Sequence, residues 1–114
     1  MRLRRKPADE AVRLVMVATD RSETAERAVR FAAEMASRYE AELLVLRVLV
    51  GADGSRAEAV RDLDEYVAGL DGERKRSAVV SADDPADAIV GAARREHADV
   101  LVVGSVGMSG RREF

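Results

Sequence analysis

Four short apolar runs recur along the chain, and longer stretches with apolar residues at helical spacing separate them. The runs are rich in valine and lack the polar alternation of a strand that faces water on one side. Such continuous runs are typical of strands covered on both faces, as parallel strands are. They predict strands at residues 14–18, 43–50, 78–80 and 100–103, of which the third has the weakest signal.

The stretches between the runs predict three helices, each with an apolar face. Ser22 suits an N-cap, the pair Asp71-Gly72 suits a stop, and Asp84-Pro85 suits an N-cap followed by proline at the first helical position. The second helix is expected over about residues 56–70. The expected faces are Ala25, Ala28, Val29, Ala32, Ala36 and Tyr39, then Val60, Leu63, Val67 and Leu70, then Ala86, Ile89, Val90 and Ala93.

Strands that alternate with helices of this length predict an α/β fold. The sheet is expected to be open, twisted and mainly parallel, with helices on both faces and right-handed crossovers. We expect one domain over residues 13–114, preceded by a basic and polar tail at residues 1–12.

Composition narrows the classes of function. Charged residues make up 35% of the chain, but the formal net charge is only −2, which argues against nucleic acid as a partner. The absence of cysteine excludes disulfides, thiolate metal sites and cysteine nucleophiles, and a single histidine excludes a histidine-rich metal cluster. No apolar run has the length of a signal peptide core or a membrane span, so we expect a cytoplasmic protein without a membrane partner.

Candidate binding residues follow the first and fourth predicted strands, because ligands of open parallel sheets bind beyond the carboxyl ends of the strands. Glycines at 104, 107 and 110 let backbone N–H groups turn toward an anion such as phosphate, and Ser105 adds a hydroxyl donor. The spacing is neither a Walker A loop nor the dinucleotide motif. A tight turn without a ligand stays open, as do two interpretations of Asp20, which could bind a ribose hydroxyl or adenine amine or cap the next helix.

No catalytic set stands out. Asp20 and Asp99 are expected at opposite ends of their strands, Ser105 has no histidine near it, and His97 is expected at the amino end of the sheet, away from the candidate site. We therefore predict no catalytic and no metal-ligating residues, and we leave slow ATP hydrolysis open.

Taken together, these segments resemble the universal stress protein family over residues 14–114. Residues 15–23 are similar to the family's first strand and its Asp-x-Ser turn, residues 43–48 to its second strand, residues 84–89 to a helix start, and residues 98–107 to its fourth strand and phosphate loop. The resemblance implies a Rossmann-like fold of the adenine nucleotide alpha hydrolase type, with strand order 3-2-1-4.

The resemblance also implies a ligand. Its ATP-binding branch uses Gly-x2-Gly-x9-Gly followed by Ser or Thr, and Gly104 and Gly107 match the first half. The implied function is binding of ATP, with or without Mg²⁺, in a stress-response or regulatory role. The implied binding residues are Asp20 at the ribose or adenine with Ala18 and Thr19 beside it, Val48 at the adenine, Val103 at the ribose, and Gly104, Ser105 and Gly107 at the phosphates.

The chain departs from the family pattern in two places. The last glycine of the motif and its hydroxyl residue would fall after residue 114, as would the usual fifth strand, so the domain reads as incomplete at its C-terminus. The fourth strand should then form a sheet edge that a homodimer or another domain covers. The alternative function is an interaction or dimerisation module that binds no nucleotide. Arg21 replaces a small residue and is expected either to hold phosphate or to project into water.

Overall fold

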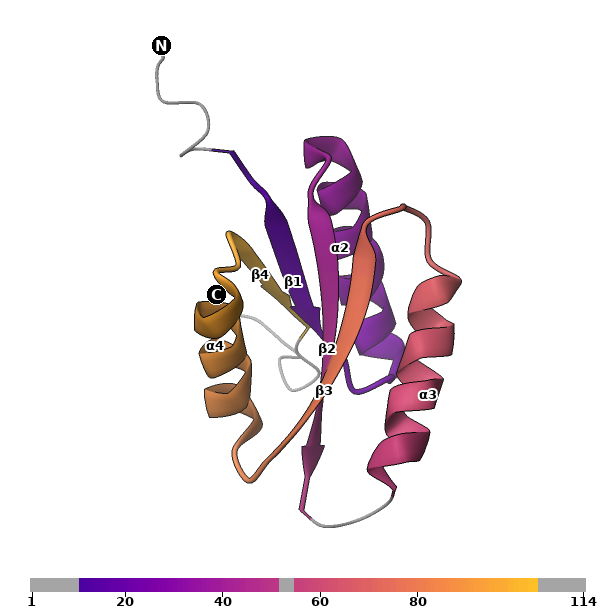
Figure 1. Ribbon diagram of the computed structural model, residues 1–114, viewed down its shortest axis with the longest axis vertical. Coiled ribbons are helices and arrows are strands. Elements are labelled where there is room, and N and C mark those ends of the chain that lie inside the picture. Colours follow the sequence, from indigo (N-terminus) through magenta and orange to yellow (C-terminus); the bar gives the residue numbers. More distant parts are fainter. Residues whose placement is uncertain (1–10, 52–54, 105–114) are drawn as a thin grey trace.

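Strands and helices alternate along the chain in the computed structural model, which describes residues 11–51 and 55–104 (Figure 1). This order confirms the α/β class. The elements are β1 (Leu14–Ala18), α2 (Glu23–Tyr39), β2 (Glu42–Val50), α3 (Arg56–Ala68), β3 (Lys75–Ala82), α4 (Pro85–Glu96) and β4 (Val100–Val103).

The sheet has the order β3-β2-β1-β4, and all three pairings are parallel. Ala18 at the end of β1 lies beside Leu46 of β2 and Val103 of β4. The expected order 3-2-1-4 is therefore confirmed. Within the described residues, β3 pairs with β2 alone and β4 pairs with β1 alone, so both form edges of this sheet.

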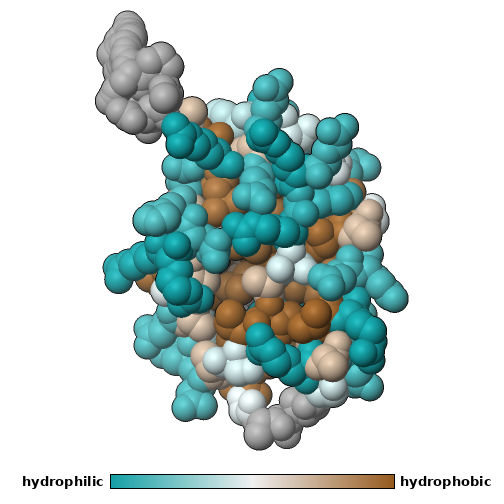
Figure 2. Space-filling model, in the orientation of Figure 1, coloured by the Kyte–Doolittle hydropathy of each residue, from teal (hydrophilic) through white to brown (hydrophobic). Residues whose placement is uncertain are grey.

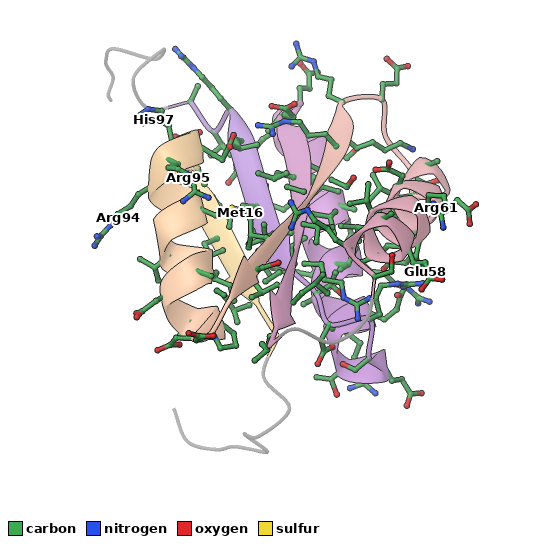
Figure 3. The ribbon with its side chains drawn as sticks, turned by 60° about the horizontal axis from the view of Figure 1, so that its bottom comes forward. Met16, Glu58, Arg61, Arg94, Arg95 and His97 are labelled. Atoms are coloured by element: carbon green, nitrogen blue, oxygen red, sulfur yellow. The ribbon has the colours of Figure 1, made fainter. Side chains whose placement is uncertain are left out.

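Helices cover both faces of the sheet, as expected. On one face α2 and α3 pack through Val29, Ala32 and Leu63 against Val15 and Val45. On the other face α4 packs through Ala92 near Met16, and Figure 3 shows Met16 in the layer between α4 and the sheet. Among the described helices, none is long and apolar enough to cross a membrane. The three layers leave the ends of the strands as the places where a ligand could reach the backbone.

The third strand is longer than the sequence predicted, since β3 runs from Lys75 to Ala82 rather than over residues 78–80. An edge strand is covered less completely than a central one, so polar residues such as Arg76 and Ser77 are tolerated in it and hide its signal. The apolar surface in the middle of Figure 2 lies where β3 crosses the front of the molecule in Figure 1. The sequence pattern therefore predicted only the apolar part of this strand.

The predicted helix starts at Ser22 and Asp84 are confirmed as N-caps, while the predicted stop of the second helix is wrong. The α3 helix ends at Ala68, and the Gly69 N–H donates to the Tyr66 carbonyl at 3.1 Å. Glycine has low helix propensity, so the helix ends there and not at residues 71–72.

Two of the predicted helical faces also need correction. Tyr39 is 56% exposed, because 17 residues of helix span about 25 Å and extend past the roughly 17 Å of five-residue β1. In α4 the buried residue is Ala92, which the prediction omitted. The helix faces the sheet through Ile89 and Ala92, so Val90, about 100° around the axis from Ile89, is exposed, as is Ala86 in the first turn.

Candidate functional site

A cavity of about 340 Å³ lies at the carboxyl ends of β1, β2 and β4, between the starts of α2 and α4. Its position is the point where the strand order reverses, since β1 has β2 on one side and β4 on the other. The volume is within the range of small-molecule sites. The lining residues are Ala18, Thr19, Asp20, Ser22, Ala25, Val48, Val50, Pro85, Ile89, Val103 and Gly104.

Most of the predicted site residues meet at this cavity. Ala18, Thr19 and Asp20 reach it from the end of β1, Val48 from β2, and Val103 and Gly104 from the end of β4. Ser105 and Gly107 lie outside the described residues. The parallel pairing of β1 with β4 thus places Asp20 and Gly104 at the same end of the sheet.

Five lining residues were not predicted as site residues: Ser22, Ala25, Val50, Pro85 and Ile89. Two of them carry a signal that the sequence already contained. Val50 ends the second strand and Pro85 starts the helix after the third strand, so the same rule about carboxyl ends applies to them. Ser22, Ala25 and Ile89 read as cap and core residues, and only the packed structure places them at a cavity.

The turn after β1 is held by a series of hydrogen bonds. The Thr19 N–H donates to the Leu46 carbonyl at 2.9 Å, and buried Thr19 Oγ1 accepts from the Arg21 N–H at 2.9 Å. Asp20 Oδ1 accepts from the Ser22 N–H at 2.9 Å, and Ser22 Oγ caps α2 by accepting from the Ala25 N–H at 3.2 Å. Asp20 therefore braces the cap of α2 and lines the cavity at the same time.

Hydrogen bonds also set the ionisation of Asp20. Those from the side chain and then the backbone of Ser22 lower the pKa of the Asp20 carboxyl below its usual value, against a smaller opposing effect of burial. Asp20 is therefore an anion at neutral pH and acts there only as a hydrogen-bond acceptor.

The lowered pKa predicts a pH effect on stability. A carboxylate whose pKa is lower in the folded state stabilises the fold above its unfolded pKa, and this contribution is lost as pH falls through the folded value. We expect the free energy of unfolding to fall below about pH 5 less steeply in an Asp20→Asn variant than in the wild type, because asparagine keeps the shape and has no charge to lose. Urea titrations at a series of pH values between about 6 and 3 measure this, and parallel curves would contradict it.

The polarity of the lining suits a ligand with an apolar part and an anionic part. Val48, Val50 and Ile89 form an apolar wall, and the described lining residues include no lysine or arginine. The amino ends of α2 and α4 border the cavity, and their dipoles favour negative charge there. Within the described residues no group of three or more carboxylates or histidines could hold a metal ion.

Gly104 passes close to α2. A Cβ built at this position would lie 3.1 Å from the Ala28 Cβ and 3.4 Å from the Thr24 carbonyl oxygen. The distance of 3.1 Å between the two Cβ atoms is shorter than an ordinary carbon–carbon contact. Glycine is therefore the residue that lets the chain leave β4 at the rim of the cavity without moving α2.

Arg21 takes neither of the two roles expected for it. Its guanidinium lies 3.8 Å from the centre of the Tyr66 ring on α3 and is paired with Asp62 of the same helix at 3.4 Å. The Arg21 side chain thus packs between α2 and α3, away from the described lining of the cavity and only partly in water.

The opposite end of the sheet carries His97 and Asp99, as expected. His97 is the C-cap of α4 and has a left-handed backbone, and Figure 3 shows it at the end of that helix. Asp99 Oδ2 accepts from the Arg13 and Leu14 N–H groups at 2.8 and 3.0 Å. Asp99 therefore fastens the start of β1 and does not pair with Asp20.

Size alone does not select the site. Hollows of about 640 Å³ between α2 and α3 and about 420 Å³ at the amino end of the sheet are larger than the cavity at Asp20. The larger ones are lined by charged surface residues such as Glu34 and Asp71. The smaller cavity combines an apolar wall, a carboxylate and two helix starts at the end of the sheet where ligands bind.

Comparison with known proteins gives one family and one fold. A model of the universal stress protein family matches residues 11–114. No protein with a curated description matches the chain.

Among solved structures, the chain is 27% identical to a universal stress protein in complex with cAMP, with a TM-score of 0.71 over 88% of this chain and 81% of that one. It is 30% identical to protein Rv1636 of Mycobacterium tuberculosis H37Rv, with a TM-score of 0.65 over 90% of this chain and 80% of that one. It is 26% identical to the universal stress protein of Archaeoglobus fulgidus in complex with dAMP, with a TM-score of 0.63 over 82% and 81%.

Proposed function

Because the chain belongs to the universal stress protein family, we propose that the cavity at the ends of β1 and β4 binds an adenine nucleotide in a regulatory role. One observation carries this proposal: Asp20 and Gly104, which come from opposite ends of the chain, line the same cavity beside an apolar wall. Two similar solved structures hold adenine nucleotides, cAMP in one and dAMP in the other, and this supports the choice of ligand.

Each part of a nucleotide has a matching surface in this proposal. The base packs against Val48, Val50 and Ile89, which are apolar and open to the cavity. The ionised Asp20 accepts a hydrogen bond from a ribose hydroxyl, and Val103 lies next to the sugar. The phosphates lie toward Gly104, with Ser105 and Gly107 following it, and the amino ends of α2 and α4 favour their charge.

We propose ATP as the physiological ligand, with nucleoside monophosphates as the main competitors. Asp20 is the one carboxylate among the described lining residues. Mg²⁺ in nucleotide sites is held by one or two carboxylates together with phosphate oxygens and waters. A magnesium ion would therefore depend mainly on the phosphates of the nucleotide. Since the described lining holds no histidine, lysine or second carboxylate to activate water, the proposed role is binding and not catalysis.

A titration of the chain with ATP, AMP and cAMP tests the proposal by following thermal unfolding. A ligand that binds only the folded state must raise the midpoint of unfolding. We expect the Asp20→Ala variant to bind about tenfold or more weakly, because a hydrogen bond to a charged group contributes about 1.5–3 kcal/mol. An Asp71→Ala variant, which removes an exposed carboxylate at the opposite end of the sheet, should bind like the wild type.

The three nucleotides separate the possible results. A shift with ATP that exceeds the shift with AMP supports a triphosphate ligand, and the reverse supports a monophosphate. No shift with any of them at millimolar concentration contradicts nucleotide binding. That result would favour the second candidate, a dimerisation module that uses β4, whose described pairing is with β1 alone and whose Val103 is 56% exposed. Sedimentation of the chain as a dimer would support this role. For either function, we propose that the protein acts in the cytoplasm.

A further inference from the structure

Arg21 lies between Asp20 and Ser22 in the turn after β1, and its backbone conformation is unusual. Its φ is 68°, in the left-handed region that residues with a Cβ rarely adopt. Its N–H donates to Thr19 Oγ1, and the next N–H, that of Ser22, donates to Asp20 Oδ1. Arg21 therefore belongs to the same hydrogen-bonded turn as Asp20, which lines the cavity.

The side chain of Arg21 belongs to a cluster that joins this turn to α3, and we refer to Arg21, Glu26, Asp62 and Tyr66 as the Arg21 cluster. The guanidinium stacks on the Tyr66 ring, with 3.8 Å to the centroid, and pairs with Asp62 at 3.4 Å and Glu26 at 3.9 Å. The Tyr66 hydroxyl donates to Glu26 Oε1 at 2.6 Å. Each member thus contacts at least one other, and together they connect α2, α3 and the turn.

Tyr66 keeps its role as a hydrogen-bond donor over the physiological pH range. Burial, and then the hydrogen bond to Glu26, raise the pKa of Tyr66 to about 12, so its hydroxyl stays a donor. Because the stacked pair of Arg21 and Tyr66 is partly buried, we expect it to stabilise the turn more than a fully solvated pair would.

We propose that Arg21 is a positioning residue, whose stacking on Tyr66 and pairing with Asp62 hold the turn at residues 19–22 in the conformation that presents Asp20 to the ligand. The part that concerns the ligand rests on the nucleotide site proposed above. The cluster supplies the contacts that offset a backbone conformation unfavourable to arginine. Because coupling between sites is reciprocal, a ligand that fixes Asp20 also strengthens the attachment of α3.

The test measures amide hydrogen exchange at Arg21 and Ser22 in the chain without nucleotide, together with the Kd of whichever of ATP, AMP and cAMP binds the wild type most tightly. Arg21→Ala removes the side-chain contacts and keeps the Cβ, and Tyr66→Leu removes the ring and hydroxyl. We expect each variant to speed exchange at these two amides and to raise the Kd, both by roughly three- to tenfold. Tyr66→Phe keeps the ring under the guanidinium, so its exchange rates at these two amides and its Kd should stay close to the wild-type values.

Controls separate positioning from a general loss of stability. Tyr39→Leu makes the same substitution at an exposed tyrosine on α2 and should change neither measurement. Exchange in the buried strand β1 should stay slow in every variant. The Arg21→Ala and Tyr66→Leu double variant should match Arg21→Ala alone, because Tyr66 acts on the turn only through its contact with Arg21.

Unchanged exchange at Arg21 and Ser22 in both single variants would overturn the proposal. An equal change in Tyr39→Leu would overturn it as well. If the wild type binds none of ATP, AMP and cAMP, the nucleotide proposal fails, and the exchange rates still decide whether the Arg21 cluster holds the turn.

Discussion

A Gly104→Val variant is expected to bind adenine nucleotide at least about tenfold more weakly than the wild type and to lose about 1–3 kcal/mol of stability. The first added carbon would lie 3.1 Å from the Ala28 Cβ, and the branches of valine extend further. Either α2 or the end of β4 must then move, and both line the cavity. Nucleotide titration followed by thermal unfolding measures both quantities.

Gly91→Ala is the matched control for this variant. Gly91 lies within α4, and a Cβ there would meet only the end of the Arg95 side chain at 3.8 Å. Alanine should stabilise the chain by up to about 1 kcal/mol through helix propensity and leave binding unchanged. A Gly104→Val chain that remains folded and binds like the wild type would show that the ligand does not approach this part of the backbone.

Replacing Leu63 with alanine is expected to lower the free energy of unfolding by about 2–5 kcal/mol. Leu63 is fully buried, and together with Val67 it accounts for the buried residues of α3. The substitution removes much of the contact that holds this helix on the sheet and leaves a cavity. Against a total stability of roughly 5–15 kcal/mol for a domain, this is a large loss. Unfolding in urea, followed by circular dichroism, measures it.

Arg61→Ala is the control on the same helix, because Figure 3 shows Arg61 on the outer side of α3 and the residue is exposed. A change within about 0.5 kcal/mol is expected there. A similar loss in both variants would contradict the expectation, because it would show that burial of Leu63 is not what distinguishes the two positions.

Local patterns in the sequence were enough to predict the order of elements and much of the site. Continuous valine-rich runs marked β1 and β4, and Ser22 and Asp84 marked helix starts because capping depends on the few residues that follow. Ligands bind beyond the carboxyl ends of parallel strands, and this rule predicted that Asp20 and Gly104 belong to the same site. The signal failed where burial was incomplete, as in β3 and along α4.

The tertiary structure alone decided what each site residue contacts. Arg21 read as a residue facing either phosphate or water, and its partners Asp62 and Tyr66 lie on a helix about forty positions later. The same holds for Ile89, whose helical spacing predicted core packing and whose place at the cavity depends on how α4 crosses the sheet. The physical reason is that periodicity and capping report a residue's own exposure and nearest neighbours. The pairing of surfaces from distant segments depends instead on the packing of whole layers.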